Sequence, residues 1–250
     1  MNYRMDIAYD GTRYNGWQKL GDTPNTIQEK IESVLASLAG GPVDVHGAGR
    51  TDAGVHAACQ VAQFRLPDSM DGTLSAEEIR SFLNRYLPDD IGILSVAEAA
   101  PRFHSRFNAT GKIYTYRLTR DMAQHVFDRR FITRLEPDTV LDLGAIRAAA
   151  RDLTGTHDFK SFCGNSHFKK STVRTIFSID VTEDGPDVTI TYHGEGFLQY
   201  MVRIMTGTLL EIGLHERPAD CIPSILDARD RRAAGKTAPP QGLTLTQVLY

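Results

Sequence analysis

The sequence lacks several features that define large classes of protein. Its 250 residues contain no apolar run close to the roughly 18–20 residues that a membrane-spanning helix needs. The N-terminal residues 1–6 also lack the apolar stretch of a secretory signal. We therefore expect a cytoplasmic protein with no membrane span.

Cysteine is scarce. The three cysteines are far apart, at Cys59, Cys163 and Cys221. An odd number without a CxxC pair argues against a disulfide framework or a zinc ribbon. The nearest histidines, His46, His56 and His104, fit no standard zinc spacing either. We expect reduced thiols, no metal and no cofactor.

The chain also has no basic excess, because it contains 28 Lys and Arg residues and 31 Asp and Glu residues, which gives a net charge of −3. Proteins that bind nucleic acid often carry such an excess. Basic residues nevertheless gather at 102–106, 129–130 and 169–174. A local positive surface is enough to attract phosphates. Composition therefore favours an ordinary cytosolic enzyme and leaves RNA binding open.

What the sequence does contain is regular apolar periodicity. In the first half, Thr26 with Glu29 and Ser75 with Glu78 predict two helix starts of the capping-box type. A glycine pair and a proline end these helices. Strands are expected over 3–9, near 43–45, over 60–66 and over 91–96. The order β-α-β-β-α-β is ferredoxin-like.

The second half repeats this order with one extra helix. Strands are expected over 112–119, 175–181, 188–192 and 243–249, and helices over 139–153, 198–213 and 222–226. We therefore predict an α+β fold with two ferredoxin-like halves, 1–105 and 106–250. We expect the halves to share an extended antiparallel sheet, with a catalytic cleft where they meet.

The most informative segment is the loop Gly47–His56, which has three glycines in its first eight residues. Glycine permits positive φ angles and a close approach to a ligand. Within the loop, Asp52 lies two residues after Arg50. The pair has three interpretations: a structural salt bridge, a catalytic acid, or part of a phosphate cradle. The last is weak because the GxxxxGK[ST] pattern is missing.

This loop resembles the active-site signature of the TruA family of tRNA pseudouridine synthases, and the resemblance extends along the chain. The other matching segments are 9–12, 14–18, 26–28, 103–107, 112–116, 196–203 and 242–245. One departure is Asn15, where the family usually has a larger residue. Membership would imply an isomerase that converts uridine to pseudouridine in the anticodon stem-loop of tRNA, at positions 38–40. It would also imply a homodimer in which one tRNA contacts both subunits.

The resemblance implies that Asp52 is the nucleophile that acts on a flipped-out uridine. Arg203 is the only charged residue between Glu195 and Glu211, and the family pattern places it against the catalytic acid. A cationic neighbour keeps a carboxylate ionised by lowering its pKa. The alternative is that Arg203 pairs with one of the two glutamates.

Four further residues are assigned to substrate binding by the resemblance: Tyr114, Arg50, Phe197 and His104. Pattern alone makes both Tyr114 and Tyr116 core residues of a strand. The family pattern selects Tyr114 to stack on the target base and leaves Tyr116 in the core. Arg50 is associated with opening the RNA stack, although it could instead clamp a phosphate or brace the loop.

Two other functions are weighed. A non-catalytic RNA-binding protein on the same scaffold would be expected to have lost the nucleophile or the tyrosine, yet Asp52, Tyr114 and Arg203 are all present. A hydrolase with paired carboxylates would need a second acid near Asp52, and the loop offers none.

Overall fold

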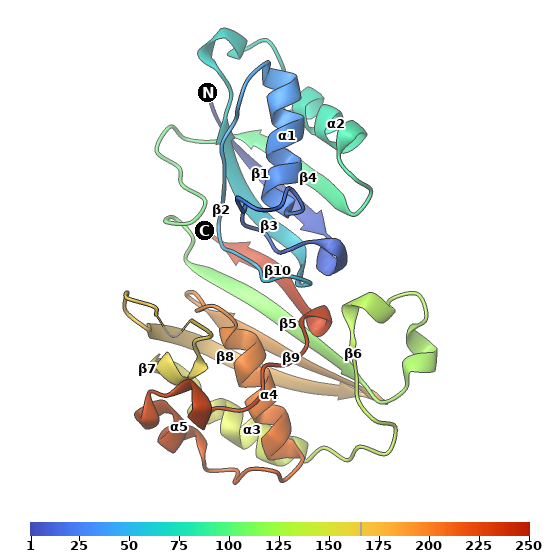
Figure 1. Cartoon of the computed structure of the whole chain (residues 1–250), viewed down its shortest axis with the longest axis vertical. Coiled ribbons are helices and arrows are strands. Elements are labelled where there is room, and N and C mark those ends of the chain that lie inside the picture. The colour runs from blue at the N-terminus through green and yellow to red at the C-terminus, as the bar shows by residue number, and fades with distance from the viewer. Residues whose placement is uncertain (166) are drawn as a thin grey trace. The chain divides into compact units, whose positions relative to one another are not determined.

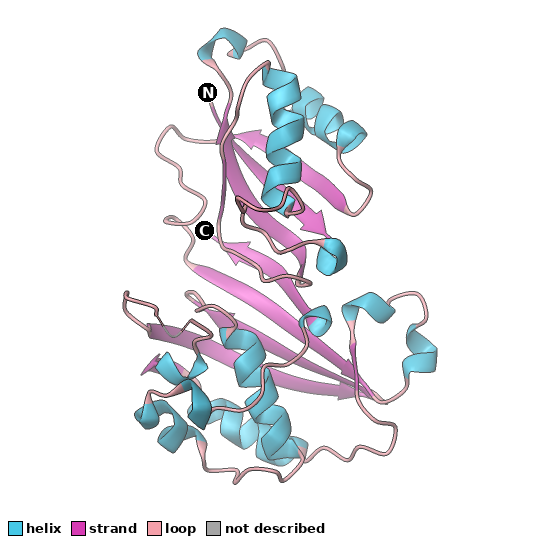
Figure 2. Cartoon of the chain, in the orientation of Figure 1, coloured by secondary structure: helices cyan, strands magenta, loops and turns pink. Residues whose placement is uncertain are grey.

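The computed structural model describes every residue except Ser166. Within the described residues the chain forms ten β-strands and five α-helices, which confirms the predicted α+β class (Figure 2). Contacts divide the chain into two compact units. One comprises Met1–Thr110 with Leu245–Tyr250, and the other is Gly111–Thr244. These units differ from the predicted halves 1–105 and 106–250 chiefly in the last residues of the chain.

The first unit has the predicted β-α-β-β-α-β order (Figure 1). Its elements are β1 (Asn2–Tyr9), α1 (Ile27–Ala39), β2 (Val45–Gly47), β3 (His56–Arg65), α2 (Ala76–Tyr86) and β4 (Ile91–Glu98). The strands lie in the order β4-β1-β3, with β2 also beside β3, and these pairs are antiparallel. This is a ferredoxin-like arrangement. The end of β10 (Leu243–Leu249) lies on the other side of β3 from β1.

Both helices of this unit begin as their sequences predict. The Thr26 side chain accepts a hydrogen bond from the Glu29 amide, and Ser75 with Glu78 forms a complete capping box. Helix α1 ends at Gly40, whose φ of 68° is the left-handed conformation that glycine adopts readily. Local capping chemistry therefore fixes these ends.

The core of the first unit lies between one face of its sheet and the two helices. Alternate residues of β1 are buried, namely Tyr3, Met5, Ile7 and Tyr9. The apolar faces of the helices are buried as well, through Ile27, Ile31 and Leu35 of α1 and Ile79 and Leu83 of α2. Strand β3 begins at His56, earlier than the predicted residue 60, because its pairing with β1 extends to Ala57 opposite Tyr9.

The second unit contains a sheet in the order β5-β9-β8-β7, with β6 parallel to β5. Its elements are β5 (Gly111–Thr119), β6 (Thr133–Arg134), α3 (Leu143–Asp152), β7 (Gly155–Asp158), β8 (Val173–Asp184), β9 (Asp187–Gly194), α4 (Met201–Gly213) and α5 (Ile222–Ala228). The strands β6 and β7 were not predicted, because two and four residues are too few to show periodicity. Helix α4 starts three residues later than predicted, because Tyr200 takes a left-handed conformation with φ of 60°.

His125 connects the loop that contains it to the start of β9 in the second unit. Its Nδ1 lies 3.0 Å from an Asp128 carboxylate oxygen, and its Nε2 lies 3.0 Å from an Asp187 oxygen. Burial disfavours the charged ring, but the hydrogen bonds to Asp187 and Asp128 outweigh burial and raise the pKa of His125. Folding therefore favours the protonated form.

This raised pKa gives a stability prediction. The contribution is complete below the ordinary histidine pKa of 6.5 and is lost as the pH rises through the higher folded value. Urea unfolding at pH 6 and pH 8 should show that His125 contributes more to the free energy of unfolding at the lower pH. The measurement is the difference between the native chain and His125→Gln, and an equal difference at both pH values would contradict it.

Among the described residues, no helix has both the length and the apolar character required to cross a membrane.

Candidate active site

The loop that carries Asp52 connects β2 to β3 and is fastened at both ends. The Ala48 amide donates to the Val61 carbonyl at 2.7 Å, and the Gln60 side-chain amide donates to the Gly49 carbonyl at 3.0 Å. Within the loop, the Val55 amide donates to the Asp52 carbonyl at 3.1 Å. The backbone on either side of a half-buried Asp52 is therefore held in a tight turn.

The end of β1 and the segment that follows it hold this loop through backbone and side-chain hydrogen bonds. The Trp17 amide donates to the Thr51 carbonyl at 3.1 Å, and the Gly54 amide donates to the Tyr14 carbonyl at 3.3 Å. The Tyr9 hydroxyl lies 2.8 Å from the Thr51 hydroxyl. Burial raises the pKa of Tyr9, so this hydroxyl stays neutral. These contacts hold the residue immediately before Asp52 through its backbone and its side chain.

Two glycines make the close approach possible. A Cβ on Gly11 would lie 2.0 Å from the Val55 carbonyl oxygen. At Gly16 the φ angle is +93°, and a Cβ would lie 2.7 Å from the Thr51 carbonyl oxygen. Asn15, the one departure from the family pattern, is exposed. Gly11 and Gly16, in the segment after β1, thus fit against the Asp52 loop itself.

His56 joins the start of β3 to the same segment. Its Nδ1 lies 3.0 Å from the Gly11 amide and 3.2 Å from an Asp10 carboxylate oxygen. His56 therefore links the start of β3 to the segment after β1 through these two contacts.

Arg50 and His104 also belong to the first unit. Arg50 is exposed on the loop, two residues before Asp52. The His104 ring is half-buried, 6.0 Å from the His46 ring and 4.3 Å from the Phe107 ring between centroids. Burial, together with the electrostatic effect of the neighbouring His46 and Arg106, lowers the pKa of His104. His104 therefore favours its neutral form and lies among aromatic rings.

The second unit brings Tyr114 and Phe197 together. Their rings meet edge to face, with centroids 5.2 Å apart, and Tyr114 is buried on β5 opposite Tyr192 of β9. The Tyr116 hydroxyl lies 2.8 Å from the Thr133 hydroxyl and donates to the Pro239 carbonyl at 2.8 Å. Burial raises the pKa of Tyr116 to about 12. Tyr116 is thus a core residue, as its pattern predicted.

Arg203 lies in the first turn of α4 and is half-buried. Its Nε donates to the Ala238 carbonyl at 2.8 Å, and its guanidinium lies 5.2 Å from the centre of the Tyr200 ring. The two glutamates considered as alternative partners have other contacts. Glu211 pairs with Arg217, and Glu195 accepts a hydrogen bond from the Thr175 amide.

The sequence did not predict several residues that hold the Asp52 loop and Arg203 in place. The Asp52 loop is fixed by Tyr9, Trp17, Gly11 and Gly16, and Arg203 is held by Tyr200 and the Ala238 carbonyl. The spacing of the glycines could have indicated a tight approach. Nothing in the sequence signals the left-handed Tyr200 or the use of a backbone carbonyl. Among the described residues, no three His, Cys, Asp or Glu side chains form a cluster that could hold a metal ion.

Comparison with known proteins identifies the family. Residues 6–108 and 149–250 match the family model described as tRNA pseudouridine synthase. The chain is 40% identical over 249 residues to tRNA pseudouridine synthase A 2 of Bacillus cereus, covering 100% of this chain and 99% of the relative. It is 42% identical to tRNA pseudouridine synthase A of Bacillus sp. (strain KSM-64), with the same coverage. The protein of that name from Geotalea uraniireducens is 42% identical, covering 99% of this chain and 98% of the relative.

The chain therefore belongs to the tRNA pseudouridine synthase family, whose members are isomerases that act on tRNA. Within that family its relatives carry the name tRNA pseudouridine synthase A, so the predicted resemblance to the TruA type is confirmed. Among solved structures, the crystal structure of a Cbf5-Nop10-Gar1 complex matches with a TM-score of 0.40 at 13% identity, covering 97% of this chain and 48% of that chain.

Proposed function

We propose that this isomerase converts uridine to pseudouridine in the anticodon stem-loop of tRNA, at positions 38–40, with Asp52 as its nucleophile. The observation that carries the proposal is the fixed turn around Asp52. Thr51 is held by Tyr9 and Trp17, and Asp52 itself accepts the Val55 amide through its carbonyl. A carboxylate kept in one place can meet a reacting atom without first being ordered.

The reaction is an isomerisation, so its atoms balance without a co-reactant. The bond between ribose C1′ and uracil N1 breaks, and a bond between C1′ and C5 forms. N1 gains a proton, and the hydrogen on C5 is lost to water. A covalent bond from Asp52, made either to the ribose or to the uracil ring, divides this exchange into two easier steps. The target nucleotide must leave the RNA stack before it can react.

Arg203 is proposed as the cation that keeps Asp52 ionised. Support comes from the sequence resemblance and from the contacts of the neighbouring acids, since Glu211 pairs with Arg217 and Glu195 with the Thr175 amide. Arginine is rarely buried without a carboxylate or an equivalent acceptor. Its role toward Asp52 rests on the family pattern.

Four residues are proposed to bind the substrate. Tyr114 stacks on the flipped base, an interaction worth about 1–3 kcal/mol per base, and the edge contact with Phe197 fixes its ring. Arg50, exposed beside Asp52, opens the stack or contacts phosphate. His104 contacts RNA from a neutral ring. We further propose that the enzyme is a cytoplasmic homodimer, because two copies could supply more positive surface than one chain of net charge −3.

The position of the target uridine is tested by mapping pseudouridines in unmodified tRNA transcripts after incubation with the protein. We expect modification of uridines 38, 39 and 40 in tRNAs of different sequence, because recognition by shape does not require fixed bases. Transcripts with cytidine at these positions serve as the control. Pseudouridine in another arm of the tRNA would contradict the proposed position while leaving the isomerase activity intact.

A further inference from the structure

Residues 234–239 of the second unit run along α4 as an extended segment, which we call the strap. Three strap amides bond to the helix. The Gly235 amide donates to the Thr208 hydroxyl at 2.9 Å, the Lys236 amide to a Glu211 carboxylate oxygen at 2.8 Å, and the Ala238 amide to the Arg203 carbonyl at 3.0 Å. The helix residues that accept these bonds, Arg203, Thr208 and Glu211, span positions 203–211 of α4. The strap is therefore attached along more than two turns.

The strap and the helix are in close contact. A Cβ on Gly207 would lie 1.8 Å from the Lys236 carbonyl oxygen, and a Cβ on Gly235 would lie 2.8 Å from Thr208 Cα. Because these two glycines have no side chain, the backbones of the strap and of α4 can come close together. The position of the strap depends on the absence of side chains there as well as on hydrogen bonds.

One end of the strap holds Arg203. The Ala238 carbonyl accepts the Arg203 Nε–H at 2.8 Å, and the neighbouring Pro239 carbonyl accepts the Tyr116 hydroxyl at 2.8 Å. The guanidinium also contacts the ring of Tyr200, at 5.2 Å from its centre. Arginine has a long, flexible stem, and a contact at Nε restricts the direction of its terminal nitrogens.

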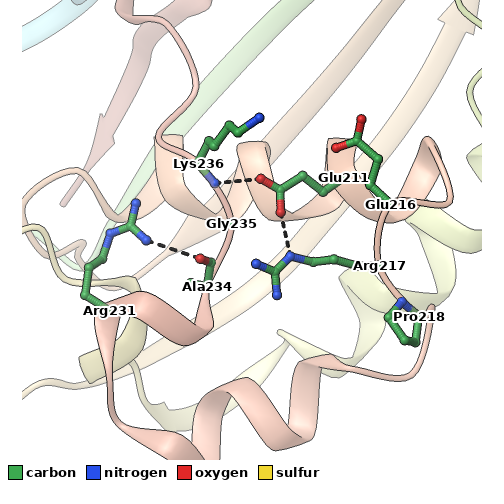
Figure 3. Close-up of a pocket in the computed structure, with 8 residues that line it drawn as sticks. All are labelled: Glu211, Glu216, Arg217, Pro218, Arg231, Ala234, Gly235 and Lys236. Carbon is green, nitrogen blue, oxygen red and sulfur yellow. Dashed lines mark hydrogen bonds and ion pairs between the residues drawn. The ribbon is translucent and has the colours of Figure 1, made fainter.

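The other end of the strap is fastened by the polar network in Figure 3, which lines an open pocket of about 740 Å³. One Glu211 carboxylate oxygen accepts the Lys236 amide, and the other accepts Arg217 Nε at 2.5 Å. Arg217 Nη1 in turn donates to the Ala233 carbonyl at 2.8 Å. Burial would raise the pKa of Glu211, but the Arg217 and Lys236 bonds outweigh it and lower the pKa. Glu211 is thus an ionised brace that joins α4 to the start of the strap.

We propose that the strap, fastened by Glu211 and Thr208, positions the Arg203 guanidinium for pseudouridine formation. This inference rests on the proposed role of Arg203 in the reaction. Glu211 and Thr208 are positioning residues, because they act through the Ala238 carbonyl. A misplacement of about 1 Å in a reacting group can lower a rate about 100-fold, so loosening the strap should reduce turnover more than substrate binding.

The first test compares Glu211→Gln with Glu216→Gln. Both substitutions remove one negative charge from the same pocket, and Figure 3 draws no interaction for the Glu216 side chain. In steady-state assays on tRNA, we expect Glu211→Gln to lower kcat by about tenfold with KM within about twofold. Glu216→Gln should match the native chain. Equal kcat values in both variants would overturn the proposal.

Thr208→Val gives a second test inside α4. Valine keeps the shape of threonine but removes the oxygen that accepts the Gly235 amide. We expect kcat to fall by roughly 10- to 100-fold, and we expect Thr208→Ser to restore most of it. Failure of serine to restore kcat would indicate that the loss comes from packing and would overturn the proposal.

A double substitution separates positioning from general destabilisation. In the Arg203→Lys background, Thr208→Val should change the remaining kcat by less than about twofold, because the guanidinium that the strap holds is already gone. A further loss equal to that seen in the native background would mean that Thr208 acts independently of Arg203. If Arg203→Leu alone leaves turnover unchanged, the proposed function of Arg203 fails. If Arg203→Leu loses turnover while Glu211→Gln and Thr208→Val keep the native kcat, the inference about the strap fails and the proposed function of Arg203 remains.

Discussion

Replacing Asp52 with asparagine should abolish pseudouridine formation while tRNA binding persists. Asparagine has the size of aspartate but is a poor nucleophile, so the covalent step is lost. Loss of a nucleophile lowers turnover by about 10⁴-fold or more. The fold around the site should survive, because Thr51, Gly54 and Val55 are held through contacts that do not involve the Asp52 carboxylate.

The assay for this variant is tritium release from tRNA labelled at uridine C5, with binding measured separately by gel shift. Asp44→Asn is a matched control, since Asp44 is an exposed aspartate in the same unit and its substitution makes the same change of charge. It should retain native turnover. Turnover by Asp52→Asn at the native rate would show that Asp52 is not the nucleophile.

The second large effect is expected at Arg203. Replacement with leucine should lower turnover by about 100-fold or more, because Asp52, the proposed nucleophile, would lose the cation that is proposed to keep it ionised and in place. The apolar neighbours of Arg203 on α4 should accommodate leucine, so the folded state should persist. Thermal unfolding of the variant checks this point alongside the tritium-release assay.

Arg203→Lys separates charge from geometry. Lysine keeps the positive charge but lacks the planar fork and the Nε that donates to the Ala238 carbonyl. We expect turnover between that of the native chain and that of Arg203→Leu. Normal turnover by Arg203→Leu would contradict the proposed role of Arg203 toward Asp52.

Local chemistry explains why much of the first unit could be predicted. Thr26 and Ser75 cap helices through hydrogen bonds that span only three residues. Alternation along β1 identifies its buried face, because a strand places successive side chains on opposite sides. The same kind of signal failed for β6 and β7, which are too short to show a period, and for the start of α4, where Tyr200 is left-handed without being glycine.

By itself, the sequence determined the β-α-β-β-α-β order of the first unit, the family, and the loop that carries Asp52. The element order and the loop depend on residues that are near one another in the chain, and the family depends on short motifs spread along it. Only the tertiary structure decided what holds that loop and what holds Arg203. Gly11 meets Val55, and Ala238 meets Arg203, across 44 and 35 residues of sequence. Contacts of this kind leave no periodic trace, because a backbone carbonyl is present at every residue and its partner is selected only when the chain folds.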